Sequence, residues 1–187
     1  MTPTRERVLR SARAAFASQG YAGASMRRIA ADAGLTAMAL YTYAPSKAEL
    51  FRLVYEDGIA RIYCSFAEVV IGRSSLVEEV DALLECGGEI LDHDPDLLRF
   101  TIRHVVDREH DDIAGLDVLT EPYLVFFEDL ARRAVGRGDI ARADAVRLVE
   151  FVTMLLWGIT TFAAIEPAKV RAAVDTAKWA AAGRLAR

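Results

Sequence analysis

Apolar residues recur along nearly the whole chain at the spacing of an amphipathic helix, and no stretch of useful length alternates as a β-strand does. The breaks in this pattern fall at residues typical of helix ends, such as Gly20, Gly34, Gly72 and the Glu166-Pro167 pair. We therefore expect an all-α fold of about nine helices. They are expected near residues 4–19, 26–33, 36–43, 46–71, 75–93, 95–109, 116–136, 143–166 and 168–185.

The composition is that of a globular protein large enough to bury a sizeable core. The chain has 187 residues, of which 53% are hydrophobic and 27% charged. The arginine-rich start does not resemble a secretory signal, and the longest uncharged apolar run, residues 151–165, is too short for a comfortable membrane span. The two cysteines, Cys64 and Cys86, lie far apart without metal spacing, which fits a reducing compartment. A cytoplasmic protein without membrane contact is expected.

The net charge of −4 conceals an uneven distribution. Residues 1–52 hold eight lysines and arginines against three acids, whereas the remainder holds 15 basic and 24 acidic residues. A basic head on an acidic body indicates that only the head meets a polyanion. The alternative is that the arginines simply coat a solvated helix face.

The first fifty residues have the pattern of a helix-turn-helix. Two short amphipathic stretches are separated by Gly34, and Ser25 and Thr36 are the expected N-caps of the two helices. Leu40 of the second stretch is expected to pack against Phe16 and Ile29, leaving polar side chains outside. This gives a helix-turn-helix domain at residues 1–50 and a larger helical body at residues 51–187.

These positions carry a specific resemblance. The chain has F-x-x-x-G-Y at the end of the first helix, followed by S-x-R-x-I-A, A-G-L-T, L-Y-x-Y and P-S-K-x-x-L. The matching positions are Phe16, Gly20, Tyr21, Ser25, Arg27, Ile29, Ala30, residues 33–36, residues 40–43, residues 45–47 and Leu50. Over about fifty residues, the chain resembles the DNA-binding head of the TetR family of bacterial transcriptional repressors.

The resemblance implies which residues meet DNA. Base contacts are expected from Arg27, Thr36, Ala37, Met38 and Thr42, and backbone contacts from Ser25, Tyr41, Tyr43 and Lys47. Lys47 stands in the first turn of its helix, where a cation opposes the helix dipole, so a DNA phosphate would explain it.

Two departures from the family pattern bear on this site. Ala37-Met38 replaces a frequent Lys-Gly and can contact thymine methyl groups but cannot donate to guanine; the alternative for Met38 is an exposed, neutral residue. Ala44 replaces an aromatic residue, leaving Tyr43 or Phe51 to fill the gap.

The resemblance also implies that the body forms a homodimer through its last two helices. The helix at 143–166 is apolar nearly all round, which a second copy would cover. The expected interface residues are Phe151, Leu155, Ile159, Phe162, Val174 and Trp179. The alternative is a core helix inside a monomer.

The resemblance further implies that the body binds a small effector, expected to be apolar or amphipathic. The candidate pocket residues are Tyr63, Phe66, Phe100, His104, Tyr123, Phe126, Phe127 and Trp157, with Thr101 and Thr153 as polar groups. Aromatic residues at helical spacing are also typical of a plain core. Pro122 either kinks its helix or stands in its first turn.

No cofactor, metal or catalytic site is expected. His104, Asp107 and His110 are close in sequence, but His110 does not share a helix face with the other two, which favours a solvated acidic loop. No phosphate-binding glycine loop, nucleophile elbow or H-E-x-x-H pattern occurs. The chain is not expected to be an enzyme.

The expected function is therefore a ligand-responsive transcriptional regulator. As a homodimer, it would bind a palindromic operator on double-stranded DNA, act as a repressor and be released by a small-molecule inducer. The alternative is a helical scaffold or binding protein whose basic head contacts an acidic protein partner.

Overall fold

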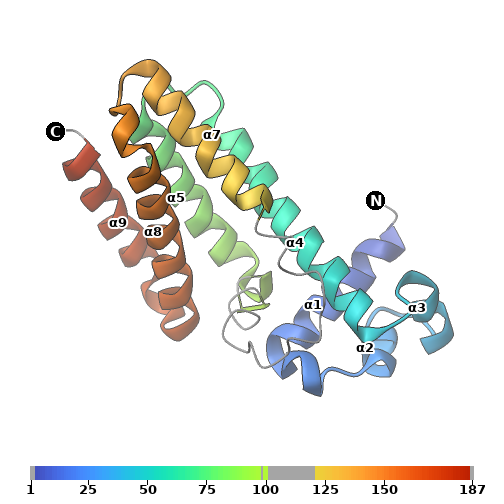
Figure 1. Ribbon diagram of the computed structural model, residues 1–187. Coiled ribbons are helices and arrows are strands. Elements are labelled where there is room, and N and C mark those ends of the chain that lie inside the picture. Colours follow the sequence, from blue (N-terminus) through green and yellow to red (C-terminus); the bar gives the residue numbers. More distant parts are fainter. Residues whose placement is uncertain (1–2, 98, 101–120, 186–187) are drawn as a thin grey trace. The chain divides into compact units, whose positions relative to one another are not determined.

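The computed structural model describes residues 3–97, 99–100 and 121–185, and the regular elements within these ranges are all helical (Figure 1). This confirms the all-α prediction. The α-helices are α1 (Pro3–Gly23), α2 (Met26–Asp32), α3 (Ala37–Tyr43), α4 (Lys47–Val70), α5 (Leu76–His93), α7 (Glu121–Arg137), α8 (Ala145–Ile165) and α9 (Val170–Leu185). Two short 3₁₀ helices, η2 (Arg142–Asp144) and η3 (Pro167–Lys169), precede α8 and α9.

The chain divides into two compact units. The first combines residues 1–60 with 94–117, and the second combines residues 61–93 with 118–187. The boundary at residue 60 lies within α4, as does the sequence-based division at residues 50 and 51. The first unit thus includes a segment beginning at Asp94, whereas the sequence-based division places this segment in the body.

The core of the first unit is built around aromatic rings. Phe51 of α4 packs edge-on against Phe16 of α1, with ring centroids 5.0 Å apart, and lies 4.9 Å from Phe100. Ile29 and Leu40 are buried in the same cluster, as the helix-turn-helix pattern predicts. The placement of Phe100 in a ligand pocket of the body is wrong, because its ring is only 2% exposed within this core.

The entry to α2 differs from the sequence prediction. Gly20 has a left-handed φ of 72° and kinks α1, whose helical segment then continues to Gly23 rather than ending at Gly20. Ser25 lies at the N-cap position of α2, but its side chain accepts no hydrogen bond from that helix. Thr36, by contrast, caps α3 as predicted, since its Oγ1 accepts a bond from the Ala39 N–H at 3.2 Å.

The second unit is a helical bundle in which α5 packs closely along α9 (Figure 1). The two helices approach each other closely at Gly88, where an added Cβ would lie 3.2 Å from Cγ2 of Val174. Ion pairs join the same two helices, because Lys178 of α9 contacts both Asp81 and Glu85 of α5.

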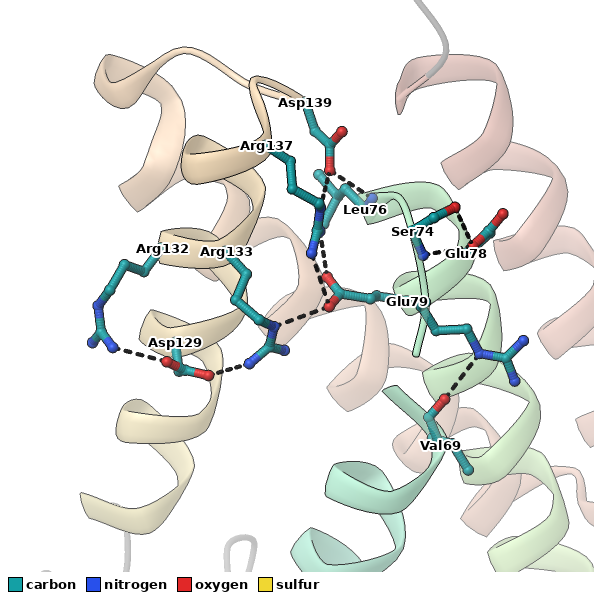
Figure 2. Close-up of polar contacts among 11 residues, drawn as sticks. Val69, Ser74, Leu76, Glu78, Glu79, Asp129, Arg132, Arg133, Arg137 and Asp139 are labelled. Atoms are coloured by element: carbon teal, nitrogen blue, oxygen red, sulfur yellow. Dashed lines mark hydrogen bonds and ion pairs between the residues drawn. The ribbon is translucent and has the colours of Figure 1, made fainter. Parts of the chain in front are cut away.

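A buried carboxylate links α5 to α7 in this unit. Glu79 is only 2% exposed at its side chain and pairs with Arg133 at 3.0 Å and Arg137 at 2.8 Å (Figure 2). Arg137 also donates to Asp139, whose same carboxylate oxygen accepts the Leu76 N–H at the start of α5. Its bond to Glu79, reinforced by Asp139, raises the pKa of Arg137 above its ordinary value. The network therefore joins the end of α7 to the first turns of α5.

Within the described residues, no helix combines the length and apolar character that crossing a membrane requires.

Candidate nucleic-acid interface

The helices α2 and α3 bury one face and expose the side chains predicted to meet DNA. Arg27 is exposed on α2, whereas the neighbouring Ile29 is fully buried. On α3, Leu40 is fully buried, whereas Met38 is 78% exposed. Most of the predicted DNA-contacting residues share this solvent-facing character, namely Ser25, Arg27, Thr36, Met38, Tyr41, Thr42 and Tyr43, while Ala37 and Lys47 are half-buried.

The turn between the two helices is held by backbone hydrogen bonds. Gly34 adopts φ of 71°, its N–H donates to the Ala31 carbonyl at 3.0 Å, and the Leu35 N–H donates to the Ala30 carbonyl at 2.8 Å. The left-handed glycine and these two bonds fix the direction in which α3 leaves α2. The exposed side chains of both helices are thereby presented from a rigid support.

Within α3, the hydroxyl of Thr42 donates to the Met38 carbonyl at 3.3 Å. Its oxygen can still accept a hydrogen bond from a base amino group. Of the two rings expected to compensate for Ala44, Phe51 lies in the core and Tyr43 is exposed.

Lys47 has partners within the protein. Its Nζ donates to the carbonyls of Ala22 and Ala24, at 3.2 Å each, and lies 4.7 Å from the ring centroid of Tyr21. These protein partners explain why a lysine is tolerated in the first turn of α4, without a DNA phosphate nearby.

Several of the basic residues in the head are neutralised internally. Arg13 of α1 is buried against Asp94 at 2.7 Å, and Arg52 pairs with Glu49 and Glu56. The bond to Glu49 raises the pKa of Arg52. The count of lysines and arginines in residues 1–52 therefore overstates the positive charge that this unit presents to solvent. Arg27 and Arg28 of α2 are among the residues that remain exposed.

Residues 8–54 match the family model of bacterial regulatory proteins of the tetR family. Over these residues the chain carries the N-terminal domain of the TetR family. No curated protein matches the sequence significantly.

Solved structures of TetR-like regulators share the fold along nearly the full chain. The fatty acid degradation regulator FadR from Bacillus halodurans is 17% identical, with a TM-score of 0.83 over 97% of this chain and 95% of that one. A TetR transcriptional regulator from Chloroflexus aurantiacus J-10-FL is 22% identical, with a TM-score of 0.79 over 98% and 94%. FadR from Bacillus subtilis, solved in complex with stearoyl-CoA, is 14% identical, with a TM-score of 0.76 over 92% and 97%. At these identities the likeness establishes the TetR fold.

Four of the predicted pocket residues come together in the second unit. The ring of Phe126 lies 6.0 Å from both Tyr63 and Phe66 and 5.1 Å from Phe127. We call these four residues of α4 and α7 the aromatic cluster. The backbones of Tyr123 and Trp157 lie in α7 and α8, but their side chains lie outside the described residues, as do His104 and Thr101.

The predicted dimer residues separate into two groups. Ile159 and Val174 are buried within the chain's own bundle, so their assignment to a surface between two copies is wrong. Trp179 is 79% exposed on α9, Phe162 is partly exposed on α8, and Phe151 and Leu155 are half-buried. Val146 and Met154 of α8 are also exposed and were missing from the predicted interface, although the all-round apolar pattern of this helix includes them.

Glu79 and its arginine partners were not predicted, because nothing in a single sequence relates α5 to α7. The metal alternative at His104, Asp107 and His110 lies outside the described residues. In the described part of the chain, no three His, Cys, Asp or Glu side chains are grouped so that they could hold a metal ion.

Proposed function

We propose that this TetR-family protein is a ligand-responsive repressor that binds a palindromic DNA operator as a homodimer. The observation that carries the proposal is the surface on α2 and α3, where polar and aromatic side chains are exposed beside the buried Ile29 and Leu40. A DNA-binding regulator of this kind works in the bacterial cytoplasm.

In this proposal, α3 enters the major groove and Arg27 reaches a base edge from α2. Arginine donates in a bidentate manner to guanine, whereas Ala37 and Met38 offer only apolar contact to thymine methyl groups. Thr36 and Thr42 supply hydroxyl oxygens. Ser25, Tyr41 and Tyr43 contact the sugar-phosphate backbone and set the register.

The exposed apolar side chains of α8 and α9 support the homodimer. Trp179, Met154 and Val146 are each more than half exposed, and burying such side chains against a second copy removes apolar surface from water. Dimer symmetry would place two heads on successive major grooves, roughly 34–36 Å apart.

The aromatic cluster supports an amphipathic effector. The phenol ring of Tyr63 packs with the apolar rings of Phe66 and Phe126, and aromatic side chains of this kind commonly line small-molecule sites. FadR from Bacillus subtilis, which shares this fold, was solved with stearoyl-CoA. An effector bound in the body would favour a separation of the heads that does not fit the operator, and DNA would be released.

Selection of bound duplexes from a random pool tests the proposal. A homodimer should select a palindrome, and its affinity for that duplex should fall linearly on a log-log plot against salt concentration. Arg27→Ala should remove discrimination between the selected and a scrambled duplex more than it weakens scrambled-duplex binding, and Arg10→Ala on the exposed side of α1 is the charge-matched control. If wild-type protein binds both duplexes alike, a head that contacts an acidic protein partner becomes the better explanation.

A further inference from the structure

The ammonium group of Lys47 joins the start of α4 to the chain that leads into α2. Its two hydrogen-bond acceptors, the carbonyls of Ala22 and Ala24, lie on either side of Gly23, just after the kink of α1. The ring of Tyr21 lies beneath the same ammonium. One side chain of α4 thus holds the segment at residues 21–24.

This arrangement offsets an unfavourable position. A cation in the first turn of a helix opposes the helix dipole by about 0.3–1 kcal/mol. Two hydrogen bonds from a charged donor, with a cation–π contact, are together larger than that cost. The lysine is therefore accounted for by protein atoms alone.

The start of α2 has no side-chain cap of its own. Ser25 makes no side-chain cap, so the helix lacks the usual side-chain acceptor at its N-terminus. Ala24, the residue before it, is buried, and its carbonyl is one of the two that Lys47 binds. Arg27 follows in the first turn of α2, three residues after this carbonyl.

We propose that Lys47 is a positioning residue: it fixes the start of α2, and hence Arg27, instead of serving as a direct contact to a DNA phosphate. The proposal rests on the proposed function, because it assigns Lys47 a role in recognising the operator. It predicts that replacing Lys47 reduces the preference for the selected duplex over a scrambled one and leaves the affinity for the scrambled duplex nearly unchanged.

Lys47→Met keeps the length of the side chain and removes its charge and donors. If Lys47 is a positioning residue, discrimination between the selected and scrambled duplexes falls roughly tenfold, the equivalent of one misplaced base contact, while the salt slope stays unchanged. If it is a phosphate contact, both duplexes lose affinity equally and the slope falls by about 0.9. The second pattern overturns the proposal.

Lys47→Arg is the second variant, because it keeps the charge and changes the donor geometry. A positioning role predicts reduced discrimination at an unchanged slope for this variant too. Wild-type discrimination in Lys47→Arg together with a reduced slope in Lys47→Met identifies a phosphate contact and overturns the proposal.

Amide hydrogen exchange without DNA tests the positioning itself. The Ala24 N–H donates to the Gly20 carbonyl at 3.1 Å and the Ile29 N–H to the Ser25 carbonyl at 2.9 Å, so both report on the start of α2. In Lys47→Met both should exchange at least about tenfold faster, while the Leu40 N–H of α3 serves as the internal reference and Arg10→Met as the charge-matched variant. Unchanged exchange at Ala24 and Ile29 overturns the inference whether or not DNA binds. Faster exchange in a protein whose wild type binds no operator supports the positioning role and refutes the proposed function.

Discussion

Arg13 donates to the Asp94 carboxylate across 2.7 Å, and the arginine side chain is only 9% exposed. The other oxygen of Asp94 accepts the N–H of Leu97 at 3.1 Å. One carboxylate therefore neutralises a buried cation of α1 and caps the turn that follows α5. The first unit depends on Asp94 for both functions.

Replacing Asp94 with Asn should destabilise the protein. Asn keeps the acceptor for Leu97 but leaves Arg13 buried without an anion, which we expect to cost about 1–3 kcal/mol of unfolding free energy. Urea denaturation measures it. Asp96→Asn is the control, because Asp96 pairs with Arg99 at 3.8 Å between two exposed side chains and should change the stability by less than about 0.5 kcal/mol. Equal effects of the two variants would contradict the assigned role.

Glu79→Gln should have a larger effect in the second unit. The substitution removes the negative charge of a side chain that is only 2% exposed, and Arg133 and Arg137 lose part of their neutralisation (Figure 2). We expect a loss of about 2–4 kcal/mol in chemical denaturation. Glu89→Gln, at an exposed position of the same helix, is the control and should lie within about 0.5 kcal/mol of wild type. If Glu79→Gln leaves the unfolding free energy unchanged, the network makes no net contribution to stability.

The helix-turn-helix was predictable because its determinants are local. Gly34 and the Thr36 cap act within a few residues of their own positions, and the apolar spacing places Ile29 and Leu40 inside. The helical class of the body followed from the same periodicity.

The partners of charged and aromatic side chains were not predictable, because they depend on which helices meet. Helical periodicity does not show that Arg13 is buried, because its partner Asp94 lies far along the chain. Phe100 was assigned to the body by its position in the chain, although it packs with Phe51 in the other unit. Val174 was assigned to a dimer surface by the same reasoning. Periodicity shows that a side chain is buried, but it does not show whether the chain's own helices or a second copy cover it.

Stability should depend on pH through Glu85. Hydrogen bonds from Lys178 and Arg171 hold the pKa of this carboxyl below its ordinary value of 4.5. A lowered folded-state pKa contributes stability that is present above the unfolded value and is lost as the pH falls through the folded one. Glu85→Gln should therefore be less stable than wild type at pH 7, and the difference should shrink progressively below about pH 4.5. Urea denaturation between pH 7 and pH 3 measures this, with the exposed Glu150→Gln as control. A difference that stays constant across this range would contradict the ion-pair explanation.

Adjacent glycines of α5 should respond in opposite ways to alanine. A Cβ at Gly87 would meet only Leu156, at an ordinary 3.9 Å, so Gly87→Ala should stabilise the protein by about 0.5–1 kcal/mol through helix propensity. A Cβ at Gly88 would lie 3.2 Å from the fully buried Val174, so Gly88→Ala should be at least about 1 kcal/mol less stable than Gly87→Ala.

The double variant Gly88→Ala/Val174→Ala provides the control for this contact. The alanine methyl at position 88 would partly fill the space that the valine leaves, so the two substitutions should together cost less than the sum of their separate effects. Thermal and urea denaturation of the four proteins in the cycle measure the coupling. Strictly additive effects would mean that positions 88 and 174 are not in direct contact.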